Sequence, residues 1–265
     1  SFVECIAEKQ GVARTRLILG GDHLGPNPWK SERTEVAMDR ARAMVAAYVA
    51  AGFTKIHLDA SMACADDAVL ADEVMADRAA DLAAVAEAAG VGALHYVIGT
   101  EVPVPGGETE HRDGLTITTP DAARHTHDLH RAAFAARGLE AAFQRVIAIV
   151  VQPGVDFGND QIIGYTPAQA RALVAAAPAL HGPLFEAHST DYQTEAALSA
   201  LVRDHFAVLK VGPELTFAYR QAVFALERLE ALLGLPASGV TAALLAAMRA
   251  RPADWRAYVE TGATE

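Results

Sequence analysis

Six short apolar runs in this chain each end in a cluster of polar residues. The runs lie at 17–19, 56–58, 96–98, 147–151, 184–185 and 208–209. Ala-rich segments with helical periodicity separate them, and strict alternation of strands with helices is typical of a parallel sheet. Because ligands bind outside the carboxyl ends of parallel strands, we expect the polar clusters to form one site.

The segments between the runs carry helix-boundary signals. Helices are expected at 31–51, 72–89, 121–137, 167–177 and 194–204, and two or more at about 214–259. Thr119, Pro120 and Asp121 combine an N-cap, a first-turn proline and an acidic first turn. Thr194 is expected to begin the later helix.

This alternation predicts an α/β fold with parallel strands, of which the (β/α)8 barrel is one form. Such a barrel takes about 31 residues per βα unit, and six units end near residue 210 here. Either the sheet is open and doubly wound, or two units are missing from the N-terminal side of a barrel. The chain opens at Ser1 within a helical segment, so we expect truncation on the N-terminal side. Since no linker divides residues 1–265, a single barrel domain is expected.

Composition restricts the classes of function. The formal net charge of -11 argues against nucleic acid as a partner. Apolar runs shorter than the ~18 residues needed to span a bilayer predict no membrane association. No secretion leader opens the chain and the two cysteines form no framework, so a cytoplasmic protein is expected. The G-x-x-x-x-G-K-[ST] and G-x-G-x-x-G motifs are absent, so no nucleotide or nicotinamide cofactor is expected.

The polar cluster at 20–27 is the richest in chemical groups. Gly21 lets a ligand approach the backbone closely. Asp22 beside His23 can supply a general acid/base next to a metal ligand. The alternative is a tight turn in which Asp22 caps a helix and His23 packs.

The cluster at 186–191 is comparably dense. Period-two alternation puts Glu186 and His188 on one strand face. His188 and His23 would make a pair of ligands for a divalent metal (Zn, Mn, Co or Ni), with Glu101 as the third. The remaining polar side chains could contact substrate or phosphate, or could cap the helix that follows. They are Ser189, Thr190 and Asp191.

Asp59 and His57 also share a strand face, so Asp59 could act as an acid/base. An ion pair with Lys55 is the alternative. The three histidines of the 121–137 helix are interpreted as part of a solvated face. They are His125, His127 and His130.

The last candidates follow later runs. Gln152 offers a neutral hydrogen-bonding group, and Lys210 beside Gly212 could contact a phosphate or act as a charged electrophile. The expected catalytic residues are therefore Asp22, Asp59, Glu186 and Lys210.

Six strings together closely resemble one protein family. They are GGDHLGPNPW, AGFTKIHLDASM, YVIGTEVPVPGG, VVQPGVDFG, FEAHSTDYQT and VLKVGPELTFAYR. The family is the non-catalytic subunit of class II tagatose-1,6-bisphosphate aldolase, also labelled tagatose-6-phosphate kinase. The likeness covers about residues 2 to 258 and implies a TIM (β/α)8-type barrel. It places two further strands ahead of Arg16, so that strands three to eight are visible in this sequence.

The resemblance also implies roles for particular residues. It places Asp22 and His23 where class II aldolases carry an acid/base aspartate and a metal-binding histidine. It places 188–190 near their metal histidine and phosphate-binding serine, and 210–212 at their final phosphate-contacting strand end.

Two main functions remain open. The first is a subunit that stabilises a catalytic class II aldolase partner, with a sugar or sugar phosphate as small-molecule ligand and homo-oligomer formation left open. The second is a metal-dependent ketose or ketose-phosphate epimerase that uses retro-aldol chemistry, with Asp22 or Asp59 removing a hydroxyl proton. A tagatose-6-phosphate kinase is a weaker alternative. The density of ionisable groups at the strand ends exceeds what a scaffold needs, which keeps the epimerase under consideration.

Overall fold

The computed structural model describes residues 2–90, 92–100, 115–158, 161–180 and 182–256. Its helices and strands, in chain order, are α1 (Phe2–Lys9), β1 (Gly20–Leu24), α2 (Thr34–Ala50), β2 (Lys55–Leu58), α3 (Asp72–Ala89), β3 (His95–Ile98), α4 (Pro120–Ala135), α5 (Glu140–Phe143), β4 (Val146–Val151), β5 (Asp156–Phe157), β6 (Ile162–Ile163), α6 (Pro167–Ala176), β7 (Leu184–Ala187), α7 (Glu195–Arg203), β8 (Phe206–Leu209), α8 (Pro213–Leu232) and α9 (Val240–Ala250).

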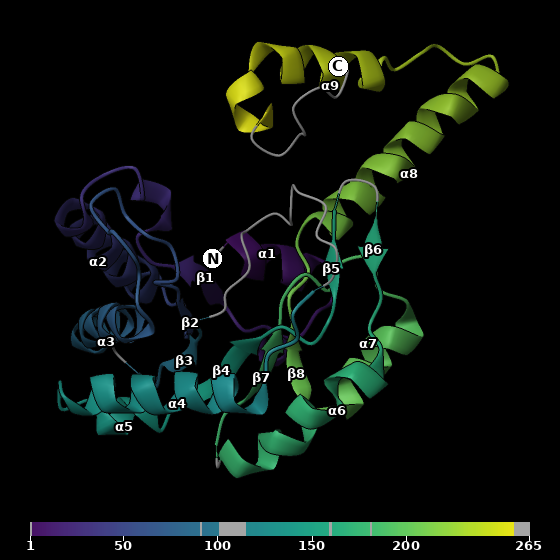
Figure 1. Ribbon diagram of the computed structural model, residues 1–265. Helices are drawn as coiled ribbons and strands as arrows, with labels where there is room; N and C mark the ends of the chain where they lie inside the picture. Colours follow the sequence, from purple (N-terminus) through teal and green to yellow (C-terminus); the bar gives the residue numbers. More distant parts are fainter. Residues whose placement is uncertain (1, 91, 101–114, 159–160, 181, 257–265) are drawn as a thin grey trace. The chain divides into compact units, whose positions relative to one another are not determined.

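Six of the strands form one sheet, in the order β1-β2-β3-β4-β7-β8 (Figure 1). The pairs β1–β2, β2–β3 and β3–β4 are parallel, while β5 and β6 form a separate antiparallel pair. The predicted α/β fold with a parallel sheet is confirmed. Six strands do not make a closed eight-stranded barrel, so that finer part of the expectation stays a prediction.

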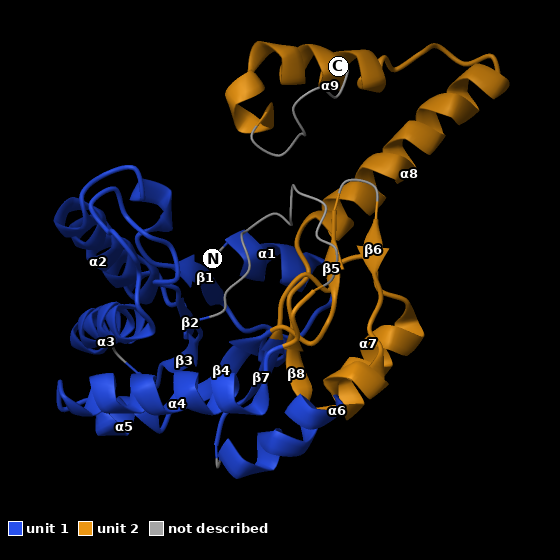
Figure 2. Ribbon diagram, viewed as in Figure 1, with its two compact units in different colours: residues 1–102, 118–151, 171–186 blue, residues 103–117, 152–170, 187–265 orange. Residues whose placement is uncertain are grey.

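The chain divides into two compact units (Figure 2). The first comprises residues 1–102, 118–151 and 171–186, and the second comprises 103–117, 152–170 and 187–265. In the first unit, α2, α3 and α4 pack side by side, and each contacts a strand of the sheet. The expectation of a single domain over the whole chain stays a prediction.

The core of the first unit lies between these helices and the sheet. The strands contribute large buried side chains, including Ile56, Tyr96 and Ile149. The helices contribute mostly alanines, such as Ala79 and Ala83 of α3, and small side chains let a helix backbone approach its neighbours closely. Among the described residues, no helix is both long and apolar enough to cross a membrane.

Local signals placed several helix boundaries correctly. The predicted helix at 72–89 matches α3. The Oγ1 atom of Thr119 accepts a hydrogen bond from the N–H of Ala122 at 3.1 Å, and that of Thr194 accepts one from Ala197 at 3.2 Å. The two predicted N-caps are therefore confirmed.

The first strand lies later in the chain than predicted. The sequence predicts a strand at 17–19, but β1 begins at Gly20, which pairs with Lys55 of β2. Asp22 and His23 therefore belong to the strand rather than to a loop after it. Gly25 follows, and a Cβ there would lie 1.6 Å from the carbonyl oxygen of Asp59, so only glycine fits where the two strand ends meet.

The prediction of a solvated histidine face on α4 is wrong for His130. This side chain is fully buried, and its Nδ1 donates a hydrogen bond to the carbonyl of Thr126 at 2.8 Å. The buried positions of α4 are Ala123, Thr126, His130 and Phe134. Their spacing of three or four residues marks the face that packs inward.

We predict that His130 makes the protein less stable at mildly acidic pH. Burial lowers its pKa to about 4, although the bond to Thr126 opposes this shift. The unfolded chain takes up the proton near pH 6.5, so the free energy of unfolding falls as pH drops from about 6.5 to 4, by about 3 kcal/mol in total. Urea unfolding at several pH values should show a shallower dependence in His130→Gln, which keeps a side-chain donor. An identical pH dependence in the two proteins would contradict this.

Candidate functional site

Two neighbouring strands of the first unit bring four ionisable side chains together. Lys55, His57 and Asp59 alternate along β2 and its end, which places them on one side of the sheet. Asp22 of β1 lies opposite: its Oδ1 is 2.9 Å from Nδ1 of His57 and 3.9 Å from Nζ of Lys55. The backbone N–H of His23 donates to the same Nδ1 at 3.3 Å, so β1 engages this ring nitrogen and Nε2 is the one that could bind a metal.

His23 and Asp59 form a second imidazole–carboxylate pair. Nδ1 of His23 donates to Oδ2 of Asp59 at 2.6 Å, and the N–H and hydroxyl of Ser61 donate to Oδ1 at 3.1 and 2.6 Å. Burial alone would raise the pKa of Asp59, but the bond from His23, the nearby His57 and the bonds from Ser61 hold that pKa well below its usual range. Asp59 is therefore an ionised group that fixes the orientation of the His23 ring.

The backbone of His23 supports a specialised role. Its φ is 50°, in the left-handed region that non-glycine residues seldom adopt. Such a conformation costs roughly 1–3 kcal/mol and persists where the surroundings enforce it, which is common at functional sites.

Glu186 brings a buried carboxylate into the same unit. It lies in β7, its side chain is 1% exposed, and its Oε2 is 3.0 Å from Nζ of Lys55. Lys55 thus stands within ion-pair distance of two carboxylates, Glu186 and Asp22.

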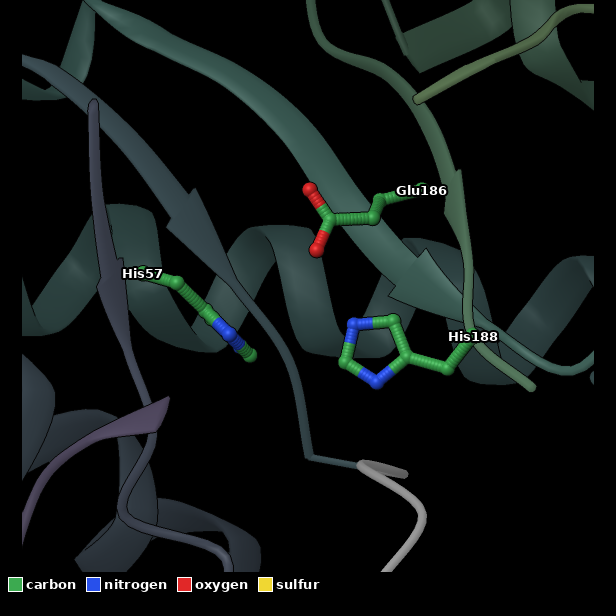
Figure 3. A group of neighbouring side chains, drawn as sticks. All are labelled: His57, Glu186 and His188. Carbon is green, nitrogen blue, oxygen red and sulfur yellow. The ribbon is translucent and has the colours of Figure 1, made fainter. Parts of the chain in front are cut away.

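A group of side chains suited to a metal ion includes this carboxylate. His57, Glu186 and His188 are all buried, and each offers one ligand atom within 4.8 Å of the other two. Figure 3 shows the three side chains directed toward one another. His188 is the residue after β7, two positions beyond Glu186 in the chain. Two imidazoles and a carboxylate are a donor set that Zn²⁺ and similar divalent ions accept in proteins.

This group overlaps only partly with the predicted metal ligands. His188 belongs to both sets. The Nδ1 of His23 is engaged by Asp59, and Glu101 lies outside the described residues. The assignments of His23 and Glu101 stay predictions.

The residues expected to bind phosphate form hydrogen bonds between the segment after β7 and the start of α8, all within the second unit. The hydroxyl of Thr190 donates to the carbonyl of Lys210 at 2.8 Å. Oδ1 of the buried Asp191 accepts the N–H groups of Gly212 and Glu214, each at 2.9 Å. The Asp191 carboxylate therefore caps the N-terminus of α8. Gly212 was expected to contact a phosphate, but its N–H already donates to Asp191.

Two other predicted residues have local structural contacts, and a third is buried. Oε1 of Gln152 accepts the N–H groups of Gly154 and Val155 at 2.8 and 3.0 Å, which closes a turn. Ser189 is buried with a φ of 54°. A Cβ on Gly21 would lie 2.6 Å from Leu24 and 2.8 Å from Tyr48 of α2, so close packing accounts for this glycine. Their substrate roles stay predictions.

Lys55 is a member of the ionisable cluster on β1 and β2 that the sequence did not predict. From the sequence it was only the alternative ion-pair partner of Asp59. The available signal was the alternation of Lys55, His57 and Asp59 along one strand, which puts all three on one face.

Comparisons with known proteins find one family model and relatives that carry different names. A family model described as "D-tagatose-1,6-bisphosphate aldolase subunit GatZ/KbaZ-like" matches residues 1–265. The chain is 52% identical over 268 aligned residues to the "D-tagatose-1,6-bisphosphate aldolase subunit GatZ" of Escherichia coli O1:K1 / APEC, covering 98% of this chain and 64% of that protein. It is 51% identical to the "D-tagatose 6-phosphate 4-epimerase" of Agrobacterium fabrum, covering 97% of this chain and 62% of that protein.

A solved structure is also similar to this chain. It is the crystal structure of a "probable tagatose 6 phosphate kinase" from Sinorhizobium meliloti 1021, with a TM-score of 0.87 and 48% identity. The match covers 99% of this chain and 65% of the other. The chain thus spans a little under two thirds of the length of these relatives.

We predict that Asp191 contributes to stability through the start of α8. Asp191→Ala removes the acceptor of two backbone N–H groups, which should lower the free energy of unfolding by about 1–2 kcal/mol. Asp39→Ala, at an exposed aspartate of α2 that pairs with Arg42, is a control expected to change it by under about 1 kcal/mol. Urea unfolding measures both, and equal effects would exclude the capping role.

Proposed function

This chain belongs to the D-tagatose-1,6-bisphosphate aldolase subunit GatZ/KbaZ-like family, and from that membership we propose that the protein is a non-catalytic, stabilising subunit of a tagatose-1,6-bisphosphate aldolase. The observation that carries the proposal is the family match over residues 1–265, together with 52% identity to a relative of that name. Its partner would be the catalytic class II aldolase subunit, and its role would lie in carbohydrate metabolism, in the cytoplasm.

We also propose that the six-stranded sheet corresponds to strands three to eight of an eight-stranded barrel. The successive parallel pairs β1–β2, β2–β3 and β3–β4 support this. The similarity to the Sinorhizobium structure also supports it, with a TM-score of 0.87 over 65% of that chain. In such a barrel the ionisable groups would line the interior and its carboxyl-end mouth, where barrel enzymes bind their substrates.

A specific observation favours a second candidate, a metal-dependent sugar-phosphate epimerase. The Agrobacterium relative named as a 4-epimerase is 51% identical to this chain. His57, Glu186 and His188 fit a divalent metal, and Asp22 would orient His57 through its Nδ1. Such a metal, when bound, would polarise a substrate carbonyl.

The protein's own groups would then move the proton. The His23 ring is the candidate, because its side chain is 14% exposed and Asp59 behind it is fully buried. Held by the Asp59 carboxylate, His23 could take a proton from a substrate hydroxyl and return it after the C3–C4 bond has opened and re-formed. In this proposal Asp59 acts through His23.

The two candidates separate in one pair of assays. As an aldolase subunit, the protein should lengthen the half-life, or raise the activity, of an added class II tagatose-bisphosphate aldolase and show no turnover alone. As an epimerase, it should interconvert tagatose 6-phosphate and fructose 6-phosphate alone with Mn²⁺, Co²⁺, Ni²⁺ or Zn²⁺, and His23→Ala should lower kcat by about 100-fold or more. Failure of both assays would refute both proposals.

We predict that His188→Ala abolishes binding of a divalent metal. The wild type, loaded with Zn²⁺ or Co²⁺ and dialysed, should retain about one ion per chain, because three buried donors converge. His125→Ala, at an exposed histidine of α4, is the matched control and should retain the metal. Full occupancy in His188→Ala would exclude this ligand set. Loss in His23→Ala but not in His57→Ala would favour the ligands inferred from sequence.

A further inference from the structure

We propose that Lys55 is the built-in counter-ion of the metal-compatible group, so that its ammonium and a bound divalent cation compete to neutralise the same carboxylates. The inference builds on the metal group of the proposed function. It assigns a role to a residue that the sequence did not single out and that neither the retro-aldol chemistry nor the subunit role requires.

The contacts of Lys55 lie within the first compact unit. Its Nζ is 3.0 Å from Oε2 of Glu186 and 3.9 Å from Oδ1 of Asp22. The aliphatic part of its side chain lies against Gly20 of the neighbouring strand β1. A Cβ at position 20 would lie 3.2 Å from the Lys55 Cδ. A side chain at position 20 would crowd the lysine, so the glycine leaves space for it.

Burial increases the cost of breaking the ion pair between Lys55 and Glu186. The side chain of Glu186 is 1% exposed and that of Lys55 is 18% exposed. An ionised carboxylate withdrawn from water is costly unless an opposite charge compensates it, and removing one partner of a buried pair destabilises strongly. Lys55 supplies that compensation when no metal is bound.

The two carboxylates that Lys55 contacts both serve the ligand group. Glu186 is one of its three members, and Asp22 holds Nδ1 of a second member, His57. Lys55 therefore keeps the ligands in place in the metal-free protein. A divalent cation that binds Glu186 must share this carboxylate with the ammonium and meets its repulsion, so Lys55 also lowers metal affinity.

The test compares Lys55→Met, which keeps most of the stem, with Lys55→Arg, which keeps the charge. Without metal at pH 8, Lys55→Met should melt at a lower temperature than the wild type, and Lys55→Arg close to it. Saturating Zn²⁺ should raise the melting temperature of Lys55→Met more than that of the wild type. Its Kd for Zn²⁺, measured by chelator competition, should be at least about tenfold lower.

A double variant separates this inference from the proposed metal group. Lys55→Met with Glu186→Gln removes the carboxylate charge together with its ammonium partner, so it should recover metal-free stability relative to Lys55→Met alone. If the wild type binds no metal, the metal group fails, while the metal-free comparison still tests the pairing of Lys55 with Glu186. Unchanged metal-free stability of Lys55→Met, no recovery in the double variant, or weaker Zn²⁺ binding by Lys55→Met would each overturn the counter-ion role.

Discussion

Ionisable side chains that leave water need an oppositely charged or hydrogen-bonding partner, and this constraint links β1, β2 and β7 of the first unit. Three contacts meet it: His57 with Asp22, His23 with Asp59, and Lys55 with Glu186. None of these pairs joins neighbours in sequence. The first two form because parallel register sets Gly20 beside Lys55, which carries Asp22 and His23 alongside the polar face of β2.

Features fixed by local physical chemistry could be predicted from the sequence. Strand-helix alternation gave the fold class, and hydroxyl N-caps gave the starts of α4 and α7. The position of β1 could not be predicted, because the apolar run at 17–19 is a stronger strand signal than the glycines that actually pair with β2. The burial of His130 could not be predicted either, because a histidine is polar and is normally expected on the solvated side of a helix. Its spacing from the other buried residues of α4 places it on the inward face.

The candidate site shows the same limit. The sequence indicated which strand ends carry ionisable groups, but which imidazole faces which carboxylate depends on register between strands. Adjacent in sequence, Asp22 and His23 point to different partners, one orienting His57 and the other held by Asp59. The metal-compatible group therefore contains His57 rather than His23. A family likeness cannot reveal such a division of roles, because it transfers residue types and not contacts.

We propose that ionisable side chains from β1, β2 and the end of β7 converge on one cation-binding group. Anomalous diffraction from crystals soaked with Zn²⁺ or Co²⁺, collected on both sides of the metal absorption edge, tests it most directly. We expect a single strong peak bounded by His57, Glu186 and His188, with Lys55 displaced from Glu186. A peak on other residues, or none at this position with the three side chains turned apart, would contradict it.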